Sequence, residues 1–166
     1  MTKETYIKMT QPFRDNPGMA KGIHIANSFL TGIMYVSYPL LLLYLFWRGE
    51  SNVWTVILVP AISFIILSVG RALINRPRPY EAFGIPPVIK KDTKGKSFPS
   101  RHVFSATLIA MTFLWMSPWM WLGVLYLVIS VCLGVVRVLS GIHYISDVVA
   151  GIVIGVLAPF IGYIIL

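Results

Sequence analysis

The sequence contains few of the residues that build disulfide frameworks and metal centres. Its one cysteine, Cys132, cannot form a disulfide within the chain and says little about the redox compartment. The cysteine and the three histidines form no cluster with metal-ligand spacing, so we expect no metal and no other cofactor. We also expect no cleavable secretion signal, because the first apolar run follows a polar, proline-containing start.

Charge is also scarce. Only 12% of the 166 residues are charged, whereas 57% are hydrophobic, and the mean hydropathy is +0.77. Soluble domains are nearer to half apolar and a quarter charged, so the composition indicates an integral membrane protein. We expect one membrane-embedded domain over 1–166. The net charge of +8 then favours anionic lipids or a phosphorylated ligand as partners, and not nucleic acid.

Five apolar runs predict an all-α bundle of about five transmembrane helices. The predicted spans are 26–47, 53–70, 100–115, 121–136 and 148–166. Residues 1–25 mix basic and apolar residues with Pro12, Pro17 and Gly18, which should break any helix there. We interpret them as an interfacial segment on the bilayer, with a disordered tail as the alternative.

Two polar stretches interrupt this pattern, and the span count places both on the same membrane face as the N-terminus. Residues 71–101 hold eight Lys or Arg, two acidic residues and five prolines. A long, rigid, basic loop in so short a chain is more often functional than a mere connection, so we predict an active-site loop over 71–102. The second stretch, 137–147, lies between two apolar runs.

The second stretch contains Arg137, His143 and Asp147, which are costly near hydrocarbon and therefore indicate a function. On a helix, His143 and Asp147 would share a face, so the carboxylate could hold one imidazole nitrogen and leave the other free to attack. With Arg137 nearby, this arrangement favours a phosphate site. A structural hydrogen bond or a proton relay is the alternative.

The first stretch offers matching groups. Arg71 and Arg78 are two helical turns apart and present donor forks that suit phosphate oxygens, although they could simply anchor a helix end. Ser100 is a good N-cap before an apolar run, and the N–H groups that follow could bind an anion. His102 could donate a proton to a leaving oxygen, although a capped helix with a surface histidine would look the same.

These clusters together resemble the type 2 phosphatidic acid phosphatase family, which shares its site with vanadium-dependent haloperoxidases. The family pattern is Lys-x6-Arg-Pro, then Pro-Ser-Gly-His, then Ser-Arg-x5-His-x3-Asp. This chain has Arg71-x6-Arg78-Pro79, Pro99-Ser100-Arg101-His102 and Val136-Arg137-x5-His143-x3-Asp147. It departs from the pattern at Arg71 for Lys, Arg101 for Gly and Val136 for Ser, and none of these removes a catalytic group. Family members commonly have six spans, so residues 1–25 stand in for the first.

The resemblance implies a metal-independent lipid phosphatase. His143 would be the nucleophile, Asp147 its buttress and His102 the proton donor. The phosphate would be bound by Arg71, Arg78, Ser100, Arg101 and Arg137. The substrate would be phosphatidic acid, phosphatidylglycerol phosphate or undecaprenyl pyrophosphate. The alternative is a non-enzymatic membrane protein that binds or transports lipid phosphates.

Two further expectations concern assembly and location. Gly151 and Gly155 form a small-xxx-small pattern, which we expect to serve packing inside the bundle and, less strongly, a homodimer. We expect a multi-pass protein of the cell membrane with its active site on the extracytoplasmic face. The positive-inside rule opposes this orientation, but catalytic arginines distort that count.

Overall fold

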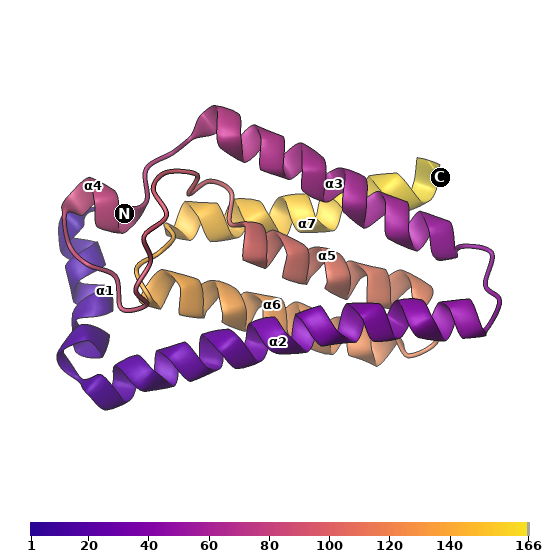
Figure 1. Cartoon of the computed structure of the whole chain (residues 1–166), viewed down its shortest axis with the longest axis horizontal. Helices are drawn as coiled ribbons and strands as arrows, with labels where there is room; N and C mark the ends of the chain where they lie inside the picture. The colour runs from indigo at the N-terminus through magenta and orange to yellow at the C-terminus, as the bar shows by residue number, and fades with distance from the viewer. Residues whose placement is uncertain (166) are drawn as a thin grey trace.

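The chain folds as a bundle in which five long helices run side by side between two ends (Figure 1). The computed structural model describes residues 1–165, and within them the regular elements are all helices. The elements are α1 (Lys3–Asp15), α2 (Pro17–Trp47), α3 (Val53–Ile74), α4 (Pro79–Phe83), α5 (Arg101–Met116), α6 (Met120–Leu139) and α7 (Ile145–Ile165). The long ones are α2, α3, α5, α6 and α7, so the predicted all-α bundle is confirmed.

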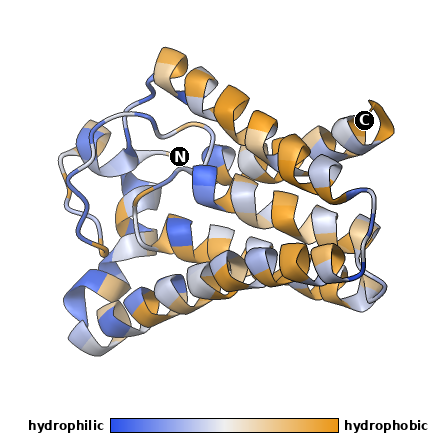
Figure 2. Cartoon of the chain, turned by 45° about the vertical axis from the view of Figure 1, so that its right-hand side comes forward, coloured by the Kyte–Doolittle hydropathy of each residue, from blue (hydrophilic) through white to orange (hydrophobic). Residues whose placement is uncertain are grey.

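The outside of the bundle is suited to lipid. In the described part of the chain, the helices α2, α3, α6 and α7 are long and apolar enough to cross a membrane. Large apolar side chains such as Phe29, Leu43, Ile66 and Val128 are exposed on these helices. Figure 2 shows hydrophobic residues along the helices and hydrophilic ones mainly in the loops and at helix ends, most of them at one end of the bundle. The fold is that of a multi-pass membrane protein, because such a surface is stable in hydrocarbon.

Helix α5 is the shortest of the five and lies among the others, contacting α2, α3, α6 and α7. Its 16 residues rise by about 24 Å, less than a hydrocarbon core of roughly 30 Å. The predicted third span is therefore a helix of the bundle that is too short, by length alone, to cross the membrane. Its side chains are mostly buried by protein, with Val103 and Phe104 fully covered.

Two glycines of α7 allow α7 to lie close against α5. A Cβ atom added to Gly151 would lie 2.9 Å from the carbonyl oxygen of Ser100, and one on Gly155 would lie 2.7 Å from Thr107 Cβ. Both glycines are buried. The pattern therefore serves packing of α7 against α5 within the chain, and the weaker expectation of a homodimer through Gly151 and Gly155 stays a prediction.

The polar segments collect at one end of the bundle. Helix α1, helix α4, the loop that leads into α5, and the turn between α6 and α7 lie together there, while the α2–α3 and α5–α6 connections lie at the opposite end (Figure 1). This arrangement confirms that the two polar stretches and the N-terminus share one end. The predicted loop is shorter than 71–102, since α3 continues to Ile74 and α5 begins at Arg101.

The N-terminal segment corrects one prediction. Pro12 does not break the helix but lies inside α1, and the chain bends only at Asn16, whose side chain accepts hydrogen bonds from the N–H groups of Gly18 and Met19. Pro17 is the first residue of α2, a position where a missing N–H costs nothing. Helix α2 therefore starts at Pro17 and not at residue 26.

Helix α1 is docked on the turn between α6 and α7. Tyr6 is fully buried, and its hydroxyl donates to the carbonyl oxygens of Ile85, at 3.3 Å, and Gly141, at 3.4 Å. Gly141 has a φ of +77°, and a Cβ there would lie 2.5 Å from the Tyr6 hydroxyl. The glycine thus provides both the left-handed backbone of the turn and the space for the tyrosine.

Candidate active site

The centre of the site is the pair formed by His143 and Asp147. Both side chains are buried, and Asp147 Oδ2 lies 3.4 Å from His143 Nδ1. His143 belongs to the turn before α7, and Asp147 lies in the first turn of α7, so the predicted four-residue spacing brings them together across the start of the helix. Because Nδ1 faces the carboxylate, Nε2 is the ring nitrogen left for chemistry.

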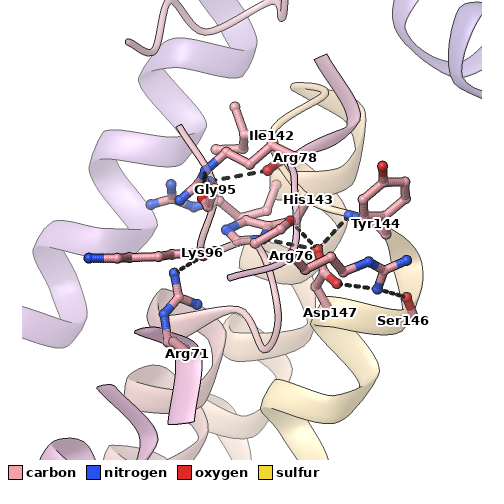
Figure 3. A network of polar contacts seen from close by, with 12 residues as sticks. Arg71, Arg76, Arg78, Gly95, Lys96, Ile142, His143, Tyr144, Ser146 and Asp147 are labelled. Atoms are coloured by element: carbon pink, nitrogen blue, oxygen red, sulfur yellow. Dashed lines mark hydrogen bonds and ion pairs between the residues drawn. The ribbon is translucent and has the colours of Figure 1, made fainter. Parts of the chain in front are cut away.

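The carboxylate of Asp147 is held from several sides (Figure 3). Oδ2 also accepts hydrogen bonds from the Ser97 hydroxyl and from the backbone N–H of Tyr144, the latter at 3.0 Å. Oδ1 accepts from Arg76 Nη1 at 2.8 Å. These donors stabilise the ionised carboxylate and fix its orientation. Arg76 and Ser97 are not among the residues that the motifs predict for the site.

A cavity of about 340 Å³ lies on the open side of His143. Its lining includes five cationic side chains and both predicted catalytic histidines, with none of the acidic residues. The lining residues are Ser68, Arg71, Arg78, Lys91, Thr93, Lys96, Arg101, His102 and His143. Such a cavity suits a group that carries more than one negative charge.

Two of the predicted phosphate ligands are anchored through part of their guanidinium groups. Arg78 donates from Nε to Gly95 O at 3.1 Å and from Nη1 to Ile142 O at 3.2 Å, and Arg71 donates from Nη2 to Lys96 O. Arg71 Nη1 is buried without a hydrogen-bond partner among residues 1–165. A donor that is buried and unused is costly, which indicates that it serves a ligand.

Ser100 behaves differently from the expected N-cap. It occupies the N-cap position of α5 with an extended backbone, but its side chain makes no capping hydrogen bond. Its hydroxyl is buried and has no partner within the described residues, while its backbone N–H donates to the carbonyl oxygen of Asp147 at 2.9 Å. Ser100 is completely buried and does not line the cavity, so its hydroxyl and the first N–H groups of α5 are donors beside the cavity that could serve an anion.

Arg137 and Arg101 occupy contrasting places. Arg137 is 4% exposed and does not line the cavity, and its Nε has no partner in the described chain. Arg101 lines the cavity with an exposed side chain, and its guanidinium lies 5.5 Å from the centre of the Phe64 ring. The site thus has a buried cation, Arg137, outside the cavity lining and an exposed cation, Arg101, in the lining.

The surroundings keep His143 neutral. Burial lowers the pKa of His143 to about 4, and the cations Arg78 and Arg137 act in the same direction, whereas the hydrogen bond to Asp147 raises it. The lone pair of the imidazole is therefore available at neutral pH. Burial also lowers the pKa of Lys91, and the neighbouring cations Arg78 and Arg137 lower it further.

The comparisons with known proteins agree with the arrangement of these residues. The family model described as the PAP2 superfamily matches residues 52–166, most of the chain. The chain belongs to the PAP2 superfamily. This confirms the resemblance inferred from the three motifs, all of which lie inside the matched region.

Two curated relatives of this PAP2 protein match most of its length at low sequence identity. The bacitracin transport permease protein BcrC of Bacillus licheniformis is 29% identical over 133 residues, covering 75% of this chain and 63% of the relative. The undecaprenyl-diphosphatase of Sulfolobus acidocaldarius is 26% identical over 133 residues, covering 79% of this chain and 64% of the relative. The chain therefore spans less than two thirds of the length of these relatives.

Two solved structures share the fold. The Aquifex aeolicus LpxE structure has a TM-score of 0.68 and 22% identity, covering 96% of this chain and 93% of the other. The PAP2-type phosphatidylglycerolphosphate phosphatase of Bacillus subtilis has a TM-score of 0.70 and 21% identity, covering 98% of this chain and 84% of the other. At such low identity the likeness establishes the membrane fold of the PAP2 chain.

No group of three or more His, Cys, Asp and Glu side chains in residues 1–165 could hold a metal ion. The expectation that the site works without a cofactor stays a prediction, which activity in the presence of a chelator would test.

Proposed function

We propose that this PAP2 protein is a lipid phosphatase that hydrolyses a phosphomonoester or a pyrophosphate through a phosphohistidine intermediate. The observation that carries the proposal is a neutral His143, buttressed by Asp147, at the wall of a cavity lined by five cations. A simple phosphate-binding site needs the cations but has no use for an oriented imidazole. The combination of the two is what phosphoryl transfer requires.

In the first step, His143 Nε2 attacks phosphorus, and the bond between phosphorus and the lipid-side oxygen breaks. The negative charge of the bound phosphate would favour the protonated form of His102, which lines the same cavity and gives its proton to that oxygen. Asp147 accepts a hydrogen bond from the Nδ1–H group of His143 and stabilises the positive charge that the imidazole gains. In the second step, water attacks phosphorus as His102 takes its proton, the bond from phosphorus to nitrogen breaks, and inorganic phosphate leaves.

Charge neutralisation would supply most of the catalysis. Arg71, Arg78 and Arg137 place guanidinium groups at this end, and unused buried donors remain at Arg71 Nη1, Arg137 Nε and the Ser100 hydroxyl. Together with the N–H groups of Arg101 and His102 at the start of α5, they would hold the three non-bridging oxygens. A negatively charged, five-coordinate phosphorus is the species these donors fit best.

The neighbourhood of the cavity supports an amphiphilic substrate. An apolar cavity of about 450 Å³ lies between α2, α3 and α5, with Tyr38, Phe64 and Leu108 among its lining residues. Phe64 also lies below Arg101, which lines the phosphate cavity. A lipid tail in the apolar cavity would thus begin beside the cations. Phosphatidic acid, phosphatidylglycerol phosphate and undecaprenyl pyrophosphate all have this form.

A non-enzymatic protein that binds or transports lipid phosphates is the second candidate, and one relative carries the name of a transport permease. Transporters usually place polar groups at mid-bilayer on broken helices. Here the cations and the two histidines gather at one end of the bundle. The buttressed imidazole favours the enzyme.

The test is phosphate release by the purified protein from the three candidate lipids, in the presence and absence of EDTA. We expect release that persists with EDTA, inhibition by vanadate, and an acid-labile phosphohistidine during turnover. His143→Ala should abolish release while the protein stays folded, because the proposed mechanism leaves the other histidine of the cavity, His102, only the proton-transfer steps. Lys94→Ala is the matched control, since Lys94 is exposed outside the cavity.

An active His143→Ala variant would remove the nucleophile assignment. Activity that disappears with EDTA and returns with magnesium would contradict the metal-independent mechanism. Tight binding of the lipids with no release under any condition would favour the non-enzymatic alternative.

A further inference from the structure

Arg76 contacts the catalytic pair from the side opposite the cavity. Its Nη1 donates to Asp147 Oδ1 at 2.8 Å and to the hydroxyl of Ser146 at 2.9 Å (Figure 3). The side chain of Asp147 is completely buried, whereas that of Arg76 is 35% exposed. Arg76 thus reaches from the surface to the carboxylate oxygen that does not face His143.

The guanidinium of Arg76 is itself held in place. It lies 4.1 Å from the centre of the Tyr144 ring and 6.0 Å from that of Phe98, so it is stacked against aromatic side chains. The carbonyl oxygen of Arg76 accepts a hydrogen bond from the N–H of Ser97 at 2.9 Å, and the Ser97 hydroxyl donates to Asp147 Oδ2. One small unit therefore holds both oxygens of the carboxylate.

The contacts continue outward to the N-terminal helix. Tyr144 packs edge-on against Phe83, with ring centres 6.3 Å apart, and Phe83 packs against Tyr6 of α1 at 5.4 Å. The side chain on which Arg76 is stacked is thus supported by α4 and, through it, by α1. This outer layer gives Arg76 a fixed position that an isolated surface arginine would not have.

Arg76 does not line the phosphate cavity. Its Nη1 group instead donates to Asp147 and Ser146, so the direct contact of Arg76 with the catalytic pair is through Asp147. An exposed ion pair is ordinarily worth little, but a donor on a buried carboxylate decides where that carboxylate points. The contact between Asp147 Oδ2 and His143 Nδ1 is long, at 3.4 Å, so a small rotation of the carboxylate would lose it.

Resting on the proposed function, we propose that Arg76 is a positioning residue that fixes Asp147, and through it the Nδ1–H tautomer of His143. By keeping the proton on Nδ1, Arg76 leaves the lone pair of Nε2 directed at the phosphate. Arg76 touches neither the phosphate nor the reacting nitrogen.

The first test is kinetic. Arg76→Gln should lower kcat by about 10- to 100-fold, the usual effect of removing a partner that orients a catalytic ligand. KM should stay unchanged, because the cavity lining is intact. Arg76→Lys keeps the charge and should recover part of kcat. Arg48→Gln is the matched control, since it removes an exposed arginine at the opposite end of the bundle and should change neither constant.

The second test does not depend on activity. In protein labelled with 15N-histidine, the signals missing in His143→Ala are assigned to His143. The unmodified protein should show a single Nδ1–H tautomer for His143, and Arg76→Gln should show a mixture of both tautomers. Arg76→Lys and Arg48→Gln should retain the single tautomer. A structural role of Arg76 in stability alone would not change this signature.

Several results would overturn the proposal. One is that Arg76→Gln leaves both the His143 tautomer and kcat unchanged. Another is that Arg76→Gln raises KM and leaves kcat unchanged, which would make Arg76 a substrate ligand. If Arg76→Gln does not fold, a fully active Arg76→Lys with a mixed tautomer would equally contradict it. Absence of phosphate release by the unmodified protein would instead count against the proposed function, and the tautomer measurement would still test Arg76.

Discussion

At the scale of single residues, Arg101 is the departure from the family pattern with the clearest consequence. Its side chain lies between the phosphate cavity and the apolar cavity, over the ring of Phe64. In the proposed mechanism, Arg71 and Arg78 bind the attacked phosphate deeper in the site. A second phosphate, placed between the first and the lipid tail, would lie nearer to Arg101. We therefore propose that Arg101 favours diphosphate head groups.

Arg101→Ala should therefore lower kcat/KM for a lipid diphosphate by about tenfold, the value of one charged hydrogen bond. Its effect on the monophosphate of the same lipid should be smaller. Both substrates should be compared in the same detergent, with Lys94→Ala as the control for loss of one exposed cation. An equal loss on both substrates would show that Arg101 acts on the attacked phosphate and does not select the head group.

The sequence motifs identified most of the proposed site residues but not the side chains that support them. The spacing of His143 and Asp147 predicted their contact because residues four apart lie on the same face of a helix. The structure brings the two side chains together. Arg76 and Ser97 meet Asp147 across 71 and 50 residues of sequence, and no local spacing indicates such contacts. The one available signal was the position of Arg76 beside the Arg78-Pro79 motif. Ser100 was placed correctly, but its hydroxyl does not cap α5.

At the scale of elements, α1 is more than a surface segment. Tyr6 buries its whole side chain against the turn that carries His143, and its hydrogen bonds there are long, at 3.3 and 3.4 Å. Packing of the ring, and not the hydroxyl, is therefore the main contribution of Tyr6. Helix α1 stabilises the catalytic turn from outside the bundle.

Tyr6→Ala should lower the free energy of unfolding by about 3 kcal/mol, as for other buried aromatic residues truncated to alanine. It should also reduce phosphate release, since the turn with His143 loses its cover. Tyr6→Phe keeps the ring and should stay close to the unmodified protein. Thermal unfolding in detergent and phosphate release measure the two effects. A Tyr6→Ala variant with unchanged stability and activity would show that α1 is dispensable.

The sequence predicted where a helix begins or ends only when that boundary coincides with the end of an apolar run. Helix α2 extends back to Pro17 because Asn16 caps it, although the residues that follow are mixed in polarity. The helix through Pro12 was not predicted, because a proline removes one hydrogen bond yet does not prevent a helix that is held by tertiary packing. The docking of Tyr6 provides that packing, and it depends on residues more than 130 positions away.

At the scale of the whole molecule, charge is distributed unevenly between the two ends. Apart from Arg48, all Lys and Arg residues belong to α1, the start of α2, the end of α3, the loop before α5, the first residue of α5 or the end of α6. The positive-inside rule applied to this distribution would place the site in the cytoplasm. We propose the opposite orientation, in the cell membrane with the site outward, because much of this charge serves the phosphate cavity.

A cysteine-labelling experiment in intact cells decides the orientation. Lys94→Cys, in a background where Cys132 is replaced by Ser, should react with a membrane-impermeant thiol reagent, because Lys94 is exposed at the site end. Glu50→Cys, exposed in the α2–α3 connection at the other end, should be labelled only after the cells are opened. The reverse pattern would place the site in the cytoplasm.

The short central helix has a consequence for the membrane itself. Ser68 lines the phosphate cavity yet lies about 9 Å along α3 before its end at Ile74, and α5 rises by only about 24 Å. A phosphate bound in this cavity would therefore lie below the end of α3, and we expect it to lie below the level of most lipid head groups. To bring substrate to it, either the substrate would sink into the protein or the surrounding bilayer would thin toward it, and hydrophobic mismatch makes the second easier in thin membranes. We therefore predict that turnover depends on the acyl-chain length of the host bilayer, independently of any residue that touches the phosphate.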